Sequence, residues 1–146
     1  MKISTKGRYA LRVMIDLALH REEGLIPLHE IAQRQGITVK YLEQIIALLS
    51  RAGFLQSVRG KSGGYRLVRP PEEYTVGDIL RATEGKLAPT ACLEVSPNQC
   101  ERRCCCPTLP FWSEFYTVIT DFLDSKTLAD LIPPEERIMP GSCLKR

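Results

Sequence analysis

Apolar residues at helical spacing dominate the first third of the chain and predict three helices. The first helix is expected over residues 6–20, where apolar side chains recur three and four positions apart. These side chains are Ala10, Val13, Met14, Leu17 and Ala18. A short second helix follows and ends at Gly36, and a third runs over 38–52 with Thr38 as its N-cap. The chain therefore opens with a three-helix unit.

Two short strand-like runs follow the third predicted helix. They span residues 54–59 and 65–69, and the five residues between them, 60–64, include three glycines. This arrangement is typical of a β-hairpin with a mobile tip. The expected fold class is therefore mainly α with a small β-hairpin.

The rest of the pattern divides into a linking helix, an aperiodic loop and a long helix. The linking helix is expected within 72–86, and the Cys-rich segment 87–108 has no apolar periodicity. A helix over 109–132 precedes a proline-broken, flexible tail, 133–146. The apolar stripe of the long helix comprises Phe111, Trp112, Phe115, Val118, Ile119, Phe122 and Leu123. One small domain offers too little cover for so wide a stripe, so we expect a dimerisation helix and a homodimer.

The composition indicates a globular protein with one compact core and an uneven charge. The chain has 146 residues, of which 44% are hydrophobic and 25% charged. We see neither a secretory signal nor the ~20 apolar residues that cross a bilayer, and expect a cytoplasmic protein without a membrane partner. Residues 1–69 hold 12 Lys and Arg against 5 Asp and Glu, whereas 70–146 hold 8 against 12. The basic first half favours a polyanionic partner.

The second and third predicted helices have the spacing of a helix-turn-helix. Ala32 supplies a small residue at the helix contact, Gly36 the turn and Leu42 an apolar anchor. The hairpin that follows carries three basic residues around its glycines, namely Arg59, Lys61 and Arg66. Basic side chains on a glycine-rich tip suit contact with phosphates and a DNA groove. Residues 1–71 are therefore predicted to form a winged helix-turn-helix that binds a double-stranded DNA operator.

The N-terminal part of the third helix is expected to enter the major groove. Its candidate DNA-binding residues are Thr38, Lys40, Tyr41, Glu43 and Gln44. Gln44 suits bidentate pairing with adenine, and Glu43 suits accepting a hydrogen bond from cytosine N4. Lys40 is better suited to a phosphate. A solvated helix surface is the alternative interpretation of each residue.

Cysteines are concentrated in one segment of the second half of the chain. Five of the six lie between residues 92 and 106: Cys92, Cys100, Cys104, Cys105 and Cys106. Such clustering, without a secretory signal, is not typical of a disulfide framework. Soft thiolates select iron-sulfur clusters, zinc or copper(I), and the paired Cys-x2-Cys units of structural zinc are absent from this sequence. The segment therefore favours a cluster or a redox thiol.

Several motifs together resemble the winged-helix iron-sulfur regulator family of IscR, NsrR, RirA and CymR. They are MKISTKGRYALRVMIDLA, YLEQI, SVRGKSGGYRL and the Cys-x7-Cys-x5-Cys arrangement, within a resemblance that runs from Met1 to about Ile132. The resemblance implies a homodimer whose long C-terminal helices cross, with each cluster loop near the first helix of the partner subunit. It also implies that Cys92, Cys100 and Cys106 hold the cluster and that Arg59 reaches the minor groove.

The resemblance leaves the fourth cluster ligand open. IscR-like members have a histidine where this chain has Leu109, and NsrR-like members have an aspartate where it has Arg8. Cys104 or Cys105 could supply the ligand, or an iron could carry an exchangeable small molecule. The wider first cysteine gap looks most like the RirA branch, which favours a [4Fe-4S] over a [2Fe-2S] cluster.

The function expected from these features is cluster-sensing regulation of transcription, as a repressor, of iron, cluster-assembly, sulfur or stress genes. One alternative is a cluster-free, CymR-like regulator whose cysteines are redox thiols and whose control comes from a protein partner. A second is an enzyme or electron carrier. No substrate-binding motif supports it, and His20 and His29 lie far from the cysteines in sequence, so we expect no enzyme.

Overall fold

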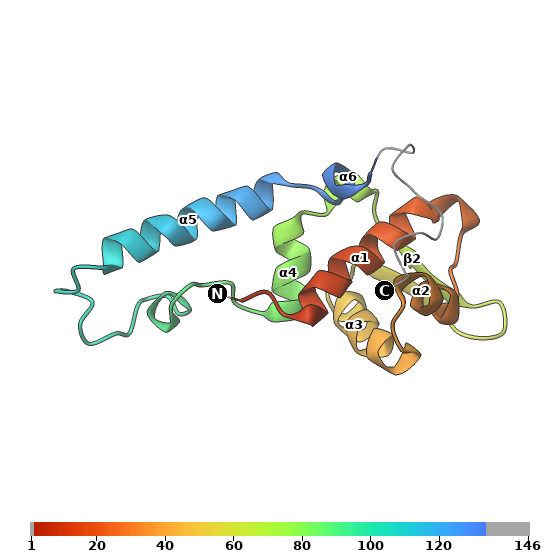
Figure 1. The fold of residues 1–146 in the computed structure, drawn as a ribbon, viewed down its shortest axis with the longest axis horizontal. Coiled ribbons are helices and arrows are strands. Elements are labelled where there is room, and N and C mark those ends of the chain that lie inside the picture. Colours follow the sequence, from red (N-terminus) through yellow and green to blue (C-terminus); the bar gives the residue numbers. More distant parts are fainter. Residues whose placement is uncertain (1, 134–146) are drawn as a thin grey trace.

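Three helices form the centre of the molecule, as the apolar spacing predicted. The computed structural model describes residues 2–133. Helices α1 (Thr5–Leu19), α2 (Leu28–Gln35) and α3 (Val39–Arg51) pack against one another in Figure 1. Their buried apolar residues form one cluster that includes Ala10, Val13, Met14, Leu17, Ile31, Ala32, Leu42, Ile45, Ile46 and Leu49. Burial of these side chains is the main term that stabilises the three-helix unit.

Local capping explains where these helices begin and end. Ser4 Oγ accepts a hydrogen bond from the Gly7 N–H, and Thr38 Oγ1 accepts one from the Tyr41 N–H. Each bond satisfies a donor that the first helical turn would leave without a partner. Gly36 has φ 64° in the left-handed region and ends α2 immediately before α3. This turn holds the two helices of the predicted helix-turn-helix together.

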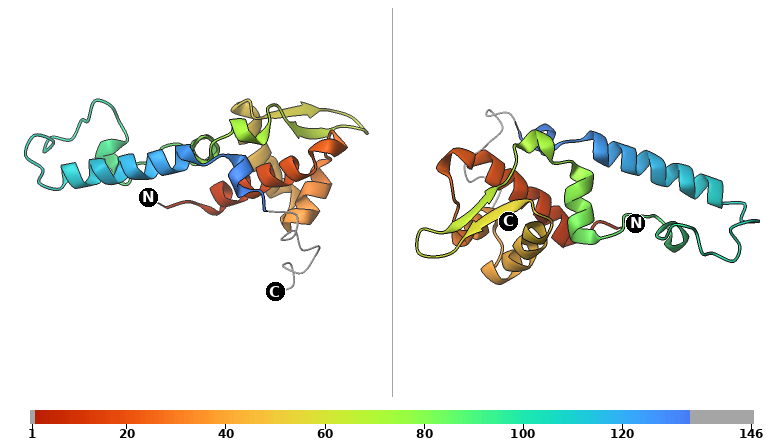
Figure 2. Two further views of the ribbon diagram at one scale, coloured as in Figure 1. Left: turned by 90° about the horizontal axis from the view of Figure 1, so that it is seen from above. Right: turned by 180° about the vertical axis from the view of Figure 1, so that it is seen from behind.

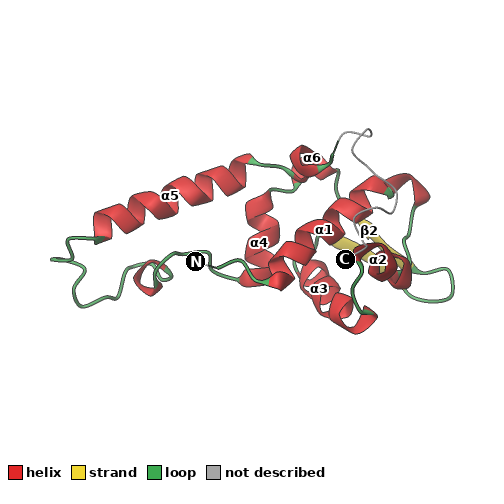
Figure 3. Cartoon of the chain, viewed as in Figure 1, coloured by secondary structure: helices red, strands yellow, loops and turns green. Residues whose placement is uncertain are grey.

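A two-stranded antiparallel hairpin, here called the wing (residues 55–67), follows α3. Strands β1 (Leu55–Val58) and β2 (Gly64–Leu67) pair with Leu55 opposite Leu67, and Figures 2 and 3 show the tip extending from the helices. The Ile26 and Tyr65 backbones exchange two hydrogen bonds of 2.9 Å, which attach β2 to the segment before α2. A mostly helical chain with one small hairpin confirms the predicted fold class.

Helix α4 (Val76–Glu84) crosses α1 and completes the body, which we define as α1 to α4 with the wing. Its last residue, Glu84, accepts three hydrogen bonds at Oε1, from Ser4 N, Ser4 Oγ and Gly7 N, at 3.1, 2.6 and 2.9 Å. A carboxylate at a helix N-terminus also complements the helix dipole. The approach is so close that a Cβ on Gly7 would collide with Glu84 Oε1.

Helix α5 (Leu109–Ser125) projects from the body as an arm, and no residue of the helix is buried. Figures 1 and 2 show the loop after α4 running away from the body, and α5 then leads the chain back toward it. The prediction of one helix over 109–132 is wrong, because α5 ends at Ser125 and a separate helix, α6 (Leu128–Leu131), follows.

Two backbone hydrogen bonds to the start of α4 determine where α5 ends. Lys126 is extended and its carbonyl accepts a hydrogen bond from Val76 N–H, while Leu128 N–H donates to the Tyr74 carbonyl, both at 2.8 Å. The chain then restarts a helix because Thr127 and Asp130 form a capping box. These two backbone bonds join the end of the arm to the start of α4.

The remaining predicted segments are simple to place. Residues 87–108, here called the Cys loop, contain one short 3-10 helix, Ala91–Leu93. The predicted tail 133–146, with Cys143, lies outside the described residues apart from Pro133. Within 2–133, we find no helix that is both long enough and apolar enough to cross a membrane.

Candidate DNA interface and cysteine centre

The N-terminal half of α3 presents most of the predicted DNA-binding residues to solvent. Lys40, Glu43 and Gln44 are exposed, as is Thr38 at the helix start. The Thr38 hydroxyl accepts the Tyr41 N–H at 3.2 Å, so this oxygen already has a structural role as the N-cap. Lys40, Glu43 and Gln44 therefore keep free side chains on one accessible turn of the helix.

Tyr41 differs from its neighbours because it is partly packed against α1. Its ring meets the Tyr9 ring edge-on, with centroids 6.0 Å apart. The Arg12 guanidinium lies over the Tyr9 ring, 4.7 Å from its centroid. This stack links the predicted recognition helix to α1, so Tyr41 supports the position of α3 as well as lining its surface.

An ion pair between a buried carboxylate and a partly exposed arginine, which the apolar pattern did not predict, orients α2 against α1. Asp16 is 4% exposed and accepts hydrogen bonds from Arg34 Nε at 2.9 Å and Arg34 Nη2 at 2.8 Å. Gln35 Nε2 donates to the same carboxylate at 3.0 Å. The hydrogen bond with Asp16 raises the pKa of Arg34 above its ordinary value, although partial burial opposes the charge. The signal was present in the sequence as an acidic residue between Val13 and Leu17 on an apolar helix face.

The wing carries its predicted basic residues in two different settings. Arg59 and Lys61 are exposed at the tip. Arg66, also exposed, lies on β2 and donates through Nε to Gln56 Oε1 on β1 at 2.8 Å. Two cations at the tip are thus free to meet an anionic partner, while the third is held along the hairpin.

The Cys loop leaves its thiols accessible but separate. Cys104 and Cys105 are exposed, and Cys92, Cys100 and Cys106 are half-buried. Across residues 2–133, no three Cys, His, Asp or Glu side chains lie together as a group that could hold a metal ion. The structure therefore does not bring the three predicted ligands to one point.

Neighbouring hydroxyls contact two of the predicted ligands. Cys92 Sγ lies 3.3 Å from Thr90 Oγ1, and Cys106 Sγ lies 3.4 Å from Thr108 Oγ1. The hydrogen bond from the Thr108 side chain lowers the pKa of the Cys106 thiol, and backbone N–H groups and the charge of Arg102 act in the same direction. Cys106 is therefore more readily ionised than an ordinary cysteine.

The chemistry of the donor set fits a soft metal centre. Five thiols lie within 15 consecutive residues, and metal binding requires the thiolate form that the surroundings of Cys106 favour. The positive charge of Arg102 acts on the same sulfur. Loading a metal centre would require the Cys loop to draw its thiols together from the positions described above.

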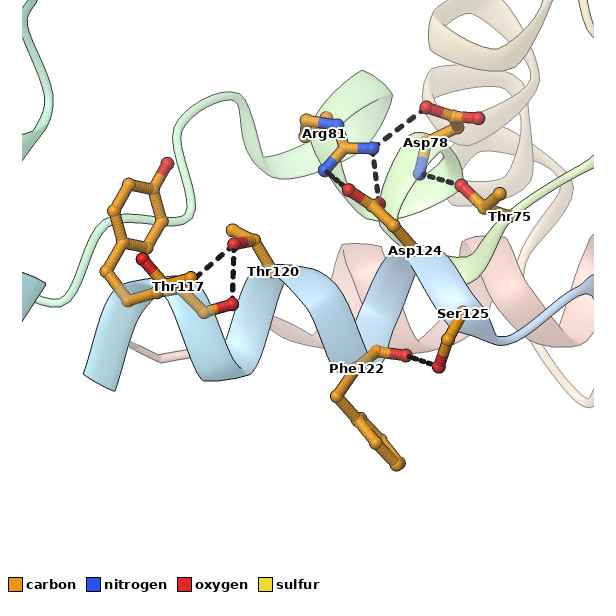
Figure 4. A network of polar contacts seen from close by, with 9 residues as sticks. Thr75, Asp78, Arg81, Thr117, Thr120, Phe122, Asp124 and Ser125 are labelled. Atoms are coloured by element: carbon orange, nitrogen blue, oxygen red, sulfur yellow. Dashed lines mark hydrogen bonds and ion pairs between the residues drawn. The ribbon is translucent and has the colours of Figure 1, made fainter. Parts of the chain in front are cut away.

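One face of α5 is apolar and open to solvent. Phe111, Val118 and Phe122 are each about 60% exposed, and Phe111 stacks on Phe115 with centroids 6.3 Å apart. The opposite face meets α4, where Figure 4 shows the Arg81 guanidinium between Asp78 and Asp124. The arm is therefore fixed to the body at its C-terminal end, through Asp124 and Leu123, and its apolar face is uncovered.

Comparison with known proteins establishes the family of this chain. The Rrf2 family model, described as an iron-dependent transcriptional regulator, matches residues 3–134. The chain belongs to the Rrf2 family. This membership confirms the resemblance stated from the sequence motifs, since the Rrf2 proteins to which the chain is similar include IscR and CymR.

Relatives and solved structures agree with this membership. The chain is 42% identical over 136 residues to the HTH-type transcriptional regulator IscR of Aliivibrio salmonicida, covering 93% of this chain and 80% of the relative. It is 42% identical over 143 residues to Protein rrf2 of Nitratidesulfovibrio vulgaris, covering 98% and 95%. Among structures, CymR of B. subtilis matches with a TM-score of 0.72, 40% identity and coverage of 90% and 96%. T. potens IscR matches with the same TM-score and identity, covering 97% and 94%.

The Rrf2 relatives define the activity of this chain in outline. They are transcriptional regulators rather than enzymes, which confirms the expectation that the protein is not an enzyme. This Rrf2 protein is a DNA-binding transcriptional regulator with a winged-helix body.

Proposed function

We propose that this Rrf2 protein senses an iron-sulfur cluster through its Cys loop and regulates transcription, as a repressor, in response. The observation that carries the proposal is the concentration of five cysteines between Cys92 and Cys106, in the loop that leads from a DNA-binding body to the arm. Soft, closely spaced thiols in a loop with few packing restraints suit a metal centre better than a role in folding. The family description as an iron-dependent regulator supports the same class of signal.

DNA contact is proposed through two parts of the body. Lys40, Glu43 and Gln44 on α3 face the major groove, with Thr38 and Tyr41 beside them at the helix start. Arg59 and Lys61 at the wing tip meet the minor groove and phosphates, and Arg66 lies along the hairpin behind them. The exposure of these side chains, apart from the half-buried Tyr41, supports the assignment.

The exposed face of α5 is proposed as the interface of a homodimer. Apolar side chains left in water at Phe111, Val118 and Phe122 are costly for a monomer. A two-fold dimer would present two recognition helices to a symmetric operator. Light scattering that gives a particle near 33 kDa, twice the 16.5 kDa chain, would agree with this assembly.

Cys92, Cys100 and Cys106 are the proposed cluster ligands, with Cys104 or Cys105 as candidates for a fourth. A bound cluster supplies redox and ligand-exchange chemistry at the loop. The chain itself contributes thiolates, and the Thr108 hydroxyl and Arg102 favour the ionised form of Cys106. We favour a [4Fe-4S] over a [2Fe-2S] type because the cysteine spacing resembles the RirA branch.

A cluster-free regulator is the competing function. The described loop keeps its thiols apart, and CymR of B. subtilis is among the similar structures. In that case the cysteines would act as redox thiols, and a protein partner would supply the signal. The two functions differ in a property that is measured on the protein alone.

Anaerobic purification with iron and sulfide analysis distinguishes them. We expect visible absorbance and about four irons and four sulfides per chain, whereas two of each would indicate a [2Fe-2S] cluster. Single Cys→Ala variants of the three proposed ligands should lose the cluster, while Cys143→Ala serves as the matched control. Loss in Cys104→Ala or Cys105→Ala would identify the fourth ligand. Protein that binds neither iron nor sulfide would support the CymR-like alternative instead.

A further inference from the structure

Tyr74 is a fully buried polar residue at the base of the wing. Its hydroxyl accepts a hydrogen bond from the Arg69 N–H at 2.8 Å and donates one to the Phe54 carbonyl at 3.1 Å. Phe54 directly precedes β1, and Arg69 follows β2 by two residues. A phenylalanine would fill the same space, and a buried hydroxyl is costly unless it is paired. The hydroxyl is therefore used to connect the two ends of the hairpin.

Aromatic packing strengthens the same connection. The Tyr74 and Phe54 rings meet edge-on with centroids 5.5 Å apart. The Arg69 guanidinium lies 4.6 Å from the centroid of the Tyr74 ring and 5.8 Å from that of Phe54. One side chain thus holds both ends of the hairpin through two hydrogen bonds and a stacked cation.

The wing is anchored at its base and exposed toward its tip, since Leu55 lies in the core, Tyr65 and Leu67 pack against it, and residues 56–62 are exposed. Only four residue pairs form its ladder, and three of the four β1 residues are exposed. A two-stranded hairpin of this size is marginal by itself. Its orientation therefore depends on the anchors at its base, which are the Ile26–Tyr65 bridge, the packing of Leu55, Tyr65 and Leu67, and the contacts of Tyr74.

The backbone of Tyr74 also belongs to the joint with the arm. Its carbonyl accepts the Leu128 N–H at 2.8 Å, next to the Thr75–Thr127 bridge. The same residue therefore contacts the base of the wing through its side chain and the end of α5 through its main chain.

We infer that Tyr74 is a positioning residue for DNA binding, which holds the wing in the direction that DNA requires and ties that direction to the end of the arm. The inference rests on the proposed contact between the wing tip and DNA. Without the hydroxyl, the tip would sample more directions, and binding would have to order it at the cost of affinity. Arg59 and Lys61 would then contribute less to binding, although neither has been changed.

A double-mutant cycle on DNA binding tests this inference. Tyr74→Phe would be measured in the normal protein and in an Arg59→Ala/Lys61→Ala background, with a DNA duplex selected by the protein from a random-sequence library. We expect Tyr74→Phe to weaken binding by about 3- to 10-fold with the normal wing and by less than about 1.5-fold in the wing-neutral background. Tyr116→Phe is the matched control, because the Tyr116 hydroxyl makes no hydrogen bond within the described chain, and it should change neither value.

The outcomes separate this inference from the proposed function. Equal weakening in both backgrounds, or no weakening at all, would overturn the role of Tyr74, since a purely structural residue would not depend on the wing charges. If the wing-neutral variant itself binds like the normal protein, the proposed wing contact is wrong and the inference falls with it. Should Tyr74→Phe fail to fold, Arg69→Lys replaces it, because it removes the stacked guanidinium and keeps the charge. A wing-dependent loss is again the expected result.

Discussion

Asp124 on α5 accepts two hydrogen bonds from the Arg81 guanidinium on α4, at 2.6 Å from Nη2 and 3.3 Å from Nη1 (Figure 4). The same Nη2 donates to Asp78 at 2.9 Å. This network joins the arm to the body together with Leu123, which packs against Val76, Leu80 and Leu87, and with the backbone joint at residues 74–76 and 126–128. The hydrogen bond with Asp124 raises the pKa of Arg81 above its ordinary value, although partial burial acts in the opposite direction.

Asp124→Asn should loosen the end of the arm without unfolding the body. The Arg81 and Asp124 side chains are 39% and 44% exposed, so the free energy of unfolding should fall by less than about 1 kcal/mol. Amide hydrogen exchange should rise in the last turns of α5 and stay unchanged in α1. Asp121→Asn is the matched control, since Asp121 is an exposed acid on the same helix. Equal exchange in the two variants would show that the ion pair does not hold the arm.

Gly77→Ala should displace the Asp124 side chain from Arg81 and so lose part of the benefit that alanine brings to a helix. A Cβ at Gly77 would run into Asp124 Oδ1 and also meet the Arg81 guanidinium. Both groups are ends of flexible, partly exposed side chains that can move aside, so the helix-propensity gain of about 1 kcal/mol should be offset in part by the lost ion pair. Thermal unfolding should show a larger gain when Asp124→Ala is already present. The same gain in both backgrounds would contradict this explanation.

Lys61→Ala should weaken binding to all DNA sequences alike. Lys61 is exposed at the wing tip, and a phosphate contact contributes affinity through counterion release. The slope of log K against log salt should fall by about one unit per half-site. Lys86→Ala, a change at an exposed residue just beyond α4, should leave the slope as it is. An unchanged slope in Lys61→Ala would exclude the phosphate contact.

Acid should remove a small part of the stability through Asp78. Partial burial acts to raise the pKa of Asp78, but hydrogen bonds from Arg81 and Thr75 outweigh it and hold the pKa below its ordinary value. A lowered carboxyl pKa contributes stability that is present above the ordinary value and is lost as the pH falls through the folded value. Urea unfolding between pH 7 and pH 3 should therefore show normal protein and Asp78→Asn converging at the acid end. Glu73→Gln, a change at an exposed site, should run parallel to the normal protein throughout.

The spacing of apolar residues was sufficient to predict the helices at the centre of the body. The apolar stripes gave the three helices to within a residue or two, and Thr38 and Gly36 act as the cap and turn that their chemistry predicted. These features depend on side chains within four positions of one another, which a linear pattern records. The wing was predicted for the same reason, because its two strands and glycine-rich tip are neighbours in the sequence.

Long-range contacts account for what the sequence did not reveal. The break of the long helix at Lys126 depends on hydrogen bonds to Tyr74 and Val76, some fifty residues earlier. The Asp16–Arg34 ion pair and the hydrogen bond from Ser4 to Glu84 likewise join distant segments. The cysteines were identified by composition, but their arrangement in space is not determined by their spacing.

The most direct test of cluster sensing is DNA affinity measured on one anaerobic sample before and after the cluster is removed. Fluorescence anisotropy with the selected duplex should show a change of about tenfold or more for the normal protein. Cys92→Ala, which lacks a proposed ligand, should show the same DNA affinity before and after the cluster-removal treatment. Identical affinities before and after removal, in normal protein shown to contain stoichiometric iron and sulfide, would contradict regulation by the cluster.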